Sequence, residues 1–251
     1  MGDFAEAVVV VTGAGRGVGQ AVAERFHAEG AEVVAARRRV STREATRERW
    51  WELAFDVADP DQVATAVAAI LDRYGRVDVL VNAAAVFGPV GLSAEIAYED
   101  YLQTVSVNLH GTFLTCRAVL PSMMERRRGK VVNFSSSAGI LHQPGQVAYN
   151  VSKAGVISLT KTLAAEVWPF GVHVNAMCPG PVDTDMIGDL LARRPPELVR
   201  RNFELFAEKR DAGLLWEPSE ATDLVVFLAS PASDRITGQY VQSSSKWAIV
   251  I

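Results

Sequence analysis

The chain has few cysteines, little net charge and no long apolar run, and each shortage excludes a class of protein. Its 251 residues include two cysteines, Cys116 and Cys178, which stand far apart and in no paired motif. This excludes a disulfide scaffold and a zinc cluster, so we expect no metal site and a reducing, cytoplasmic location. The formal net charge of −4 lacks the basic excess of a nucleic-acid-binding protein.

No segment has the pattern of a membrane span or a secretion signal. The most apolar stretch, from Val77 to Leu92, is interrupted by Asp78, Asn82 and Gly88 and falls short of the ~20 apolar residues that a span requires. The first six residues carry acids where a signal peptide needs bases. We therefore expect a soluble protein that binds neither membranes nor nucleic acids and acts on a small molecule.

Short β-branched runs alternate with longer amphipathic patterns along the chain. This alternation predicts an α/β fold: a single-domain, doubly wound parallel sheet, Rossmann-like, with helices on both faces. The charge-rich segment 183–218 is predicted to be a substrate flap within that domain, residues 1–251. The expected strands are 7–11, 32–36, one centred on 53–55, 77–81, 130–134, 172–176 and 239–242. The expected helices are 18–29, 60–74 (capped by Asp59 and ended by Gly75), 98–126, 149–167 and 221–229.

The first expected strand runs into a glycine-rich turn that opens a helix. The turn reads Thr12-Gly13-Ala14-Gly15-Arg16-Gly17-Val18-Gly19. Glycines allow a tight turn and a close approach of the backbone to a pyrophosphate, while the helix N-terminus offers unpaired N–H groups to that anion. Because a strand precedes the turn and a helix follows it, the pattern predicts dinucleotide binding rather than an ordinary glycine-rich turn.

The end of the second expected strand distinguishes the two nicotinamide dinucleotides. NAD sites usually place an acid there for the ribose 2′-hydroxyl, whereas this chain has Arg37, Arg38 and Arg39. Arginine offers bidentate hydrogen bonds to a 2′-phosphate, and Arg16 in the glycine turn could reach the same group. We therefore expect NADP (NADPH) in preference to NAD, with a solvated basic loop as the alternative interpretation.

Tyr149 and Lys153 are four residues apart, on one face of an expected helix. A cationic lysine beside a tyrosine is expected to lower the phenol pKa from ~10 and to make it a usable proton donor or acceptor. This spacing alone also occurs by chance in many helices. The serines at 135–137 lie at the C-terminal end of the fifth expected strand, the edge where open α/β sheets bind ligands.

Taken together, these motifs resemble the classical short-chain dehydrogenase/reductase family over nearly the whole chain. The resemblance rests on the glycine turn, Asn82, Asn108, Ser136, Tyr149, Lys153, the segment Pro179-Gly180-Pro181-Val182-Asp183-Thr184 and the segment Ile236-Thr237-Gly238-Gln239. It implies an oxidoreductase that transfers hydride between a nicotinamide and a ketone or secondary alcohol. A homotetramer, or a homodimer, is the implied assembly.

The resemblance implies a catalytic role for four residues. Tyr149 would be the general acid in carbonyl reduction and the base in alcohol oxidation. Lys153 would lower the Tyr149 pKa and hold the nicotinamide ribose. Ser136, selected because the family's serine lies 13 residues before its tyrosine, would stabilise charge on the substrate oxygen. Asn108 would keep a helix locally open and hold a water that joins Lys153 to solvent.

The resemblance, with the arginines above, also implies the binding residues. The residues expected to bind the cofactor are Gly13, Arg16, Gly17, Val18, Gly19, Arg37, Arg38, Asp56, Val57, Asn82, Tyr149, Lys153, Pro179, Gly180, Val182 and Thr184. The residues expected to line the substrate pocket are Ala138, Leu141, His142, Gln143 and Gln146, with Phe87, Pro181 and the flap beyond Asp185. This mostly apolar lining favours a bulky ketone or secondary alcohol. Arginines 193, 194, 200 and 201 could instead attract an acidic substrate, although charged helix faces are usually just solvated.

The sequence departs from the family in two places. Asn82-Ala83-Ala84-Ala85 replaces Asn-Asn-Ala-Gly, which removes a bracing amide and narrows the approach to the cofactor. The residues 243–246 replace Val-Asp-Gly-Gly near an end that packs at a subunit interface, and the apolar residues 247–251 suit burial against a partner. Two other functions stay open: an NAD-dependent secondary-alcohol dehydrogenase, and a non-catalytic dinucleotide sensor or scaffold. The intact tyrosine, lysine and serine argue against the second.

Overall fold

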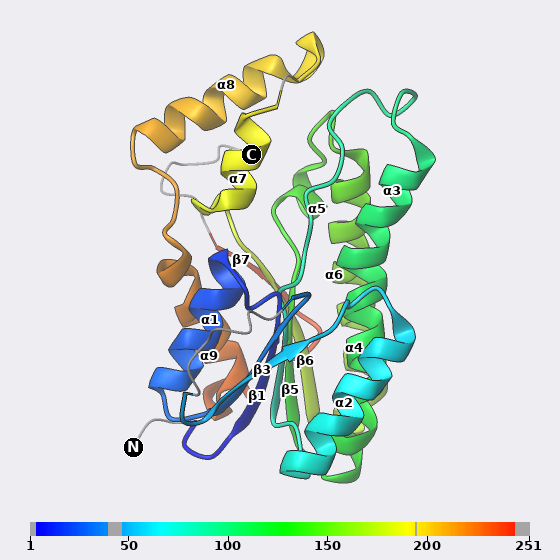
Figure 1. Ribbon diagram of the computed structural model, residues 1–251, viewed down its shortest axis with the longest axis vertical. Helices are drawn as coiled ribbons and strands as arrows, with labels where there is room; N and C mark the ends of the chain where they lie inside the picture. Colours follow the sequence, from blue (N-terminus) through cyan, green and yellow to red (C-terminus); the bar gives the residue numbers. More distant parts are fainter. Residues whose placement is uncertain (1–3, 40–46, 194, 244–251) are drawn as a thin grey trace.

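The computed structural model describes residues 4–39, 47–193 and 195–243, which contain a seven-stranded parallel sheet (Figure 1). The strand order is β3-β2-β1-β4-β5-β6-β7, so the connections reverse direction between β1 and β4. A reversal of this kind leaves a crevice at the carboxyl ends of the strands, where ligands bind. The strands are β1 (Val8–Thr12), β2 (Glu32–Arg37), β3 (Trp50–Ala54), β4 (Val79–Asn82), β5 (Gly129–Phe134), β6 (Val172–Cys178) and β7 (Tyr240–Gln242).

Helices cover both faces of the sheet, which confirms the predicted doubly wound arrangement. Helices α1 and α9 lie on one face, and α2, α3, α4 and α6 lie on the other (Figure 1). The helices of the described residues are α1 (Gly17–Ala28), α2 (Pro60–Tyr74), α3 (Tyr98–Val105), α4 (Gly111–Glu125), α5 (Ala138–Leu141), α6 (Val147–Val167), α7 (Asp185–Leu191), α8 (Glu197–Asp211) and α9 (Thr222–Ala229). None of them is long and apolar enough to cross a membrane.

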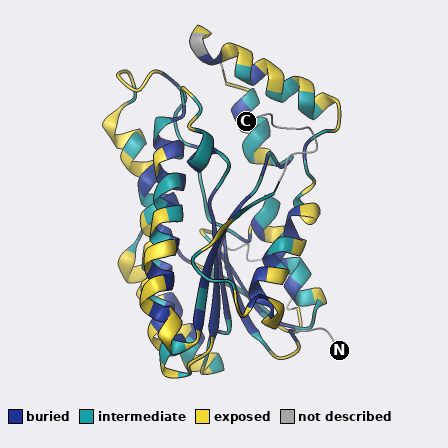
Figure 2. Ribbon diagram, turned by 180° about the vertical axis from the view of Figure 1, so that it is seen from behind, coloured by how far each residue is buried: buried dark blue, intermediate teal, exposed yellow. Residues whose placement is uncertain are grey.

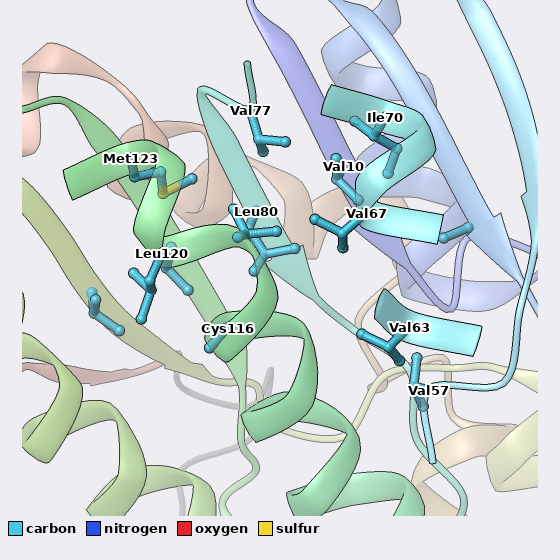
Figure 3. Packing of buried hydrophobic residues seen from close by; sticks show 14 of the residues in the cluster. Val10, Val57, Val63, Val67, Ile70, Val77, Leu80, Cys116, Leu120 and Met123 are labelled. Atoms are coloured by element: carbon cyan, nitrogen blue, oxygen red, sulfur yellow. The ribbon is translucent and has the colours of Figure 1, made fainter. Parts of the chain in front are cut away.

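The central strands β1, β2, β4, β5 and β6 are buried from both sides (Figure 2), whereas the edge strands β3 and β7 are only partly buried. All five residues of β1 are buried, which explains why its sequence is a continuous apolar run rather than an alternating one. On one face, Val67 and Ile70 of α2 and Met123 of α4 pack with Leu80 of β4 (Figure 3). On the other face, helices α1 and α9 bury a second apolar cluster that includes Phe26.

Helix α2 begins and ends where the sequence predicts. The Asp59 carboxylate accepts hydrogen bonds from the N–H groups of Asp61 and Gln62, both at 3.0 Å, and Pro60 occupies the first helical position. Gly75 ends the helix in the left-handed conformation, with φ of 69°.

The structure differs from the predicted elements in three places. Strand β3 begins at Trp50, so the predicted centre at 53–55 lies too late in the sequence. The long helix predicted at 98–126 is divided by a π-helical turn, η1 (Ser106–His110). The four-residue helix α5 was not predicted, because one turn is too short to show a helical period.

Helices α7 and α8 form the flap, which lies above the carboxyl ends of the strands (Figure 1). Its two ends are tied together at the base. Trp216 donates to the Pro181 carbonyl at 3.0 Å, and Asp183 donates to the Trp216 carbonyl at 2.8 Å. The two ends of the flap therefore meet at a single parallel β-bridge, between Val182 and Trp216.

Candidate active site

A cavity of about 580 Å³ lies between the carboxyl ends of the strands and the flap. It is lined by the glycine turn, the end of β2, the loops after β3, β4, β5 and β6, the start of α6, and the flap. The predicted site residues that line it are Gly13, Arg16, Gly17, Val18, Gly19, Arg37, Arg38, Asp56, Val57, Ser136, Ala138, Gln143, Gln146, Tyr149, Lys153, Pro179, Gly180, Val182 and Thr184. Asn82, Asn108, Leu141 and His142 lie outside this lining.

The glycine turn is shaped so tightly that side chains would not fit. A Cβ on Gly13 would lie 2.7 Å from the Ala84 backbone, and the φ of Gly13 is +70°. A Cβ on Gly19 would lie 2.3 Å from the carbonyl oxygen of Gly13. Among the described residues, no side chain caps the first turn of α1 and no acid stands in it. Uncapped N–H groups at the cavity wall fit the pyrophosphate of a dinucleotide.

The arginines at the end of β2 occupy different environments. The Arg37 guanidinium donates to the carboxylate of Glu52 in the neighbouring strand β3, and both side chains are only 18% exposed. Arg38 and Arg39 are exposed and line the cavity. Arg16 lies 3.8 Å from the Asp189 carboxylate of α7. Sequence reasoning missed Glu52, because its contact with Arg37 spans 15 residues and two strands.

The loop after β3 is fixed by local hydrogen bonds. The Asp56 carboxylate accepts from the Ala58 N–H at 2.9 Å, and the Asp56 N–H donates to the Gln62 side chain at 3.0 Å. Val57 lies against Gly111 at the start of α4, where a Cβ would come within 2.7 Å of the valine side chain. These contacts hold Asp56 and Val57, two of the residues expected to bind the cofactor, in the cavity wall.

Tyr149, Lys153 and Ser136 meet at the centre of the cavity. Lys153 donates to the Phe134 carbonyl at 2.7 Å, and its Nζ lies 5.7 Å from the centroid of the Tyr149 ring. The Ser136 hydroxyl accepts from the Ala138 N–H at 3.1 Å and lies near enough to the Tyr149 phenol to lower its pKa against the effect of burial. The neighbouring Ser135 donates to the Lys153 carbonyl at 2.8 Å, so it braces α6 against β5.

Burial shifts the pKa values of both titratable groups in this set. Burial raises the pKa of Tyr149 to about 12, while the hydrogen bond with Ser136 acts in the opposite direction. Burial also lowers the pKa of Lys153 to about 8. The sequence predicts a lowered phenol pKa, but the structure shows a raised one. Desolvation favours the neutral form of each group, and for the Tyr149 pKa it outweighs the opposing effect of Ser136.

Asn108 lies in the π-helical turn η1 and is completely buried. Its side chain accepts from the Val86 N–H at 2.8 Å and donates to the Val86 carbonyl at 2.9 Å and to Ser152 at 3.0 Å. It therefore joins the loop after β4 to helix α6, which carries Tyr149 and Lys153. The wide turn is the opening in the helix that the resemblance implies, and the water relay stays a prediction.

Asn82 is buried beneath the cavity rather than exposed to it. Its side chain donates to Asn133 at 2.9 Å and accepts from Thr115 at 2.7 Å, so it links β4 to β5 and α4. The bracing expected from a second asparagine has another source. The Thr12 hydroxyl accepts from the N–H groups of Ala83 and Ala84, both at 3.2 Å, a role that the sequence did not reveal.

An apolar wall closes the cavity over Tyr149. The Phe87 ring stacks on the Tyr149 ring with centroids 4.7 Å apart and an interplanar angle of 21°. Phe87 also packs with Leu190, Val199 and Phe203 of the flap. This separate cluster gives the cavity an apolar side next to the Tyr149 ring.

The polar side of the substrate pocket consists of two glutamines. Gln143 and Gln146 line the cavity, and their side chains hydrogen-bond at 3.4 Å. His142, with φ of 49°, lines a second hollow of about 290 Å³ instead. The flap cations considered for acidic substrates have local partners: Arg193 donates to the Gly88 carbonyl, Arg200 pairs with Glu197, and Arg201 pairs with Glu204 and Glu208. Residue 194 lies outside the described residues.

Comparison with known proteins agrees with this geometry. The family model for short chain dehydrogenases matches residues 7–195. The chain is 36% identical to the 3-oxoacyl-acyl-carrier-protein reductase FabG of Thermotoga maritima. The similarity extends over 241 residues, which are 93% of this chain and 94% of that protein. The chain is 35% identical over 241 residues to the 2-(R)-hydroxypropyl-CoM dehydrogenase of Xanthobacter autotrophicus, with 92% and 94% covered.

Solved structures share the fold as well. A NAD+-bound xylitol dehydrogenase superposes with a TM-score of 0.87 at 26% identity, over 97% of this chain and 99% of that one. Levodione reductase superposes with a TM-score of 0.85 at 30% identity, over 95% and 96%. The resemblance read from the sequence is therefore confirmed. The chain belongs to the short-chain dehydrogenase/reductase family of nicotinamide-dependent oxidoreductases, which act on carbonyl and alcohol groups.

Proposed function

We propose that this protein is an NADP(H)-dependent carbonyl reductase that acts on bulky, largely apolar ketones. The observation that carries this proposal is the position of Tyr149. Its phenol lies beside Ser136 and Lys153, under an apolar wall, in a cavity whose other end presents Arg38. The chemistry is that of the family. The apolar wall favours an apolar ketone as the substrate, and Arg38 favours NADP(H) as the cofactor.

The chain's own residues handle the proton. A bound nicotinamide supplies the hydride in reduction and accepts it in alcohol oxidation. Tyr149 keeps its proton at neutral pH because burial raises its pKa to about 12, so it can donate to a carbonyl oxygen that gains charge. Ser136 would donate a hydrogen bond to the same oxygen. These properties favour the reductive direction.

Lys153 has two tasks in this proposal. Through its hydrogen bond to the Phe134 carbonyl it fixes the catalytic helix against β5. In the role that the family resemblance implies, its ammonium group also holds the nicotinamide ribose. Asn108 would complete the proton path behind it, since Asn108 contacts Ser152 in the same helix.

The choice of NADP(H) is supported by the end of β2. Arg38 is exposed at the cavity, and the described residues hold no ion pair that occupies it. An arginine in this position offers a bidentate contact to a 2′-phosphate. A further support is that the residues predicted to bind the cofactor, Asn82 excepted, all line the same cavity.

The second candidate is an NAD-dependent secondary-alcohol dehydrogenase. The observation in its favour is the pair between Arg37 and Glu52, which neutralises one of the expected phosphate ligands. Binding affinity separates the two: titration of the purified protein, followed by nicotinamide fluorescence, should give tighter binding of NADPH than of NADH. Tighter binding of NADH would contradict the proposed cofactor.

A non-catalytic sensor or scaffold is the candidate from another class. It predicts cofactor binding without turnover. The reductase predicts that NADPH is consumed with a panel of bulky ketones. Tyr149→Phe should slow this consumption of NADPH. Its matched control is Tyr98→Phe, at a tyrosine that is 67% exposed on α3, which should leave the rate unchanged.

The proposed assembly is a homotetramer or a homodimer in the cytoplasm. Leu102, Phe113 and Val151 are exposed on α3, α4 and α6, which lie side by side on one face of the molecule (Figure 1). An apolar helix face suits a partner subunit. Residues 244–251, on which the sequence analysis also based this expectation, lie outside the described residues. Sedimentation of the purified protein tests it, and a monomer would contradict it.

A further inference from the structure

Glu52 is the one charged residue of strand β3, and it lies behind the cofactor cavity rather than in its lining, whereas Arg37 lines the cavity. Strand β3 pairs with β2 in a register that places Glu52 opposite Ala35 and Ala54 opposite Arg37. Glu52 is thus paired two residues before Arg37, the last residue of β2, so the two side chains lie diagonally on the same face of the sheet and form an ion pair.

The aliphatic part of the Arg37 side chain is held in place, as is its guanidinium group. A Cβ on Gly15 would lie 3.5 Å from both Cβ and Cδ of Arg37, so the arginine stem lies against the glycine turn. The guanidinium is only 18% exposed, and so is Glu52. Separating two partly buried charges leaves each of them poorly solvated, so the pair resists being broken by an incoming anion.

We propose that Glu52 sets the cofactor specificity by holding Arg37 away from the 2′-phosphate. Of the two neighbouring arginines, Arg37 and Arg38, only Arg38 then binds that phosphate. The inference rests on the proposed function, because it concerns the cofactor of the same site. The Arg37–Glu52 pair is neutral as a unit and gives no net attraction to a phosphate. A second effect acts in the same direction: the Glu52 carboxylate repels a phosphate dianion placed beside it.

The test measures cofactor affinity rather than turnover. We expect Glu52→Gln to release Arg37 and to lower the Kd of NADPH about tenfold, the value of one charge-assisted hydrogen bond, while the Kd of NADH stays within about twofold. The nicotinamide-free pair 2′,5′-ADP and 5′-AMP, measured by calorimetry, should show the same change. An unchanged ratio of the two affinities, or a weaker binding of NADPH, would overturn the proposal.

A matched control separates this local effect from a general change in charge. Glu48 is exposed in the turn before β3, and Glu48→Gln removes one negative charge four residues away from Glu52. We expect it to leave the NADPH to NADH ratio unchanged within about twofold, since exposed charges are screened. An equal shift in both variants would overturn the assignment to Glu52.

Two further variants keep the proposal falsifiable if Glu52→Gln does not fold. The double variant Arg37→Gln/Glu52→Gln replaces the pair with neutral side chains of similar shape, and we expect it to bind NADPH within about twofold of the wild type. A tenfold loss would show that Arg37 binds the phosphate despite Glu52. Arg38→Gln should weaken NADPH about tenfold and leave NADH unchanged, and an unchanged ratio would overturn the role of Arg38.

Failure of this inference and failure of the proposed function give different results. If the wild type prefers NADH, the proposed cofactor is wrong, but the change in ratio caused by Glu52→Gln is still measured. If the wild type prefers NADPH and Glu52→Gln leaves the ratio unchanged, the proposed function stands and the role of Glu52 is wrong.

Discussion

Two regions enclose the cavity: the floor, formed by the glycine turn, the carboxyl ends of the strands and the start of α6, and the flap, formed by α7 and α8. Different forces hold each region in place. In the floor, Asn108, Lys153 and Ser135 are almost completely buried and make hydrogen bonds of 2.7–3.0 Å to neighbouring elements. The flap is held by a small apolar cluster around Phe203 and by ion pairs with exposed side chains. Exposed pairs contribute little, so the flap depends on the apolar cluster.

This difference assigns separate tasks to the two regions. Proton transfer requires a geometry fixed within tenths of an ångström, and the buried network of the floor supplies it. Substrate entry and product release require motion, and we expect the flap to supply it, since it has few buried residues and its two ends are joined by a single β-bridge. Changes in the floor should therefore alter cofactor binding and chemistry, whereas changes in the flap should alter substrate affinity.

The strongest way to break the floor is Gly13→Ala. A methyl group there meets the Ala84 backbone at 2.7 Å and forces a non-glycine residue to φ of +70°. We expect the Kd of NADPH to rise about a hundredfold or more, because the turn must shift away from the cofactor. Fluorescence titration measures it.

Its control is Gly75→Ala, at φ of +69° with nothing among the described atoms within 4 Å of the added carbon. This change has the same backbone strain without the contact, so we expect about 1 kcal/mol of lost stability and unchanged binding. Equal binding losses in the two variants would show that strain, and not the contact with Ala84, is responsible.

Phe203→Ala should weaken the flap and leave the floor intact. Phe203 is buried against Phe87, and its loss removes apolar contacts that keep the flap closed. We expect the KM of a ketone substrate to rise about tenfold, while the Kd of NADPH stays within about twofold. Leu205→Ala, on the same helix at a side chain that is 39% exposed, should change neither. A loss of NADPH binding in Phe203→Ala would contradict the separation of tasks.

The smallest expected effect is the pH response of the floor. A phenol whose pKa is raised to about 12 stays protonated across the neutral range and ionises only in strong alkali. The ultraviolet difference spectrum between the wild type and Tyr149→Phe should therefore show no tyrosinate at this position below about pH 10. A transition with a midpoint below pH 9 would show that Lys153, rather than burial, controls this group.

The sequence predicted the elements whose signals are local. The continuous apolar run of β1, the Asp59 cap and the Gly75 stop each depend on neighbouring residues, and all three are present. The start of β3 was missed because two tryptophans after an arginine-rich segment give no alternating pattern. The motif spacing also placed Tyr149 and Lys153 together on α6, as the structure has them.

What could not be predicted depends on contacts between distant segments. The direction of the Asn82 side chain is set by Thr115 and Asn133, which lie 33 and 51 residues away in the sequence. The capture of Arg37 by Glu52 depends on the register of β2 and β3. The pKa of Tyr149 depends on burial beneath Phe87 and the flap, which no local pattern reports.

The central claim, that Tyr149 donates the proton in carbonyl reduction, is tested most directly by single-turnover oxidation of NADPH with a ketone substrate. For Tyr149→Phe, we predict a rate about 10²–10⁴ times lower than that of the wild type, measured at NADPH concentrations at which the variant still binds the cofactor. A variant that reduces the ketone at nearly the wild-type rate would contradict the account.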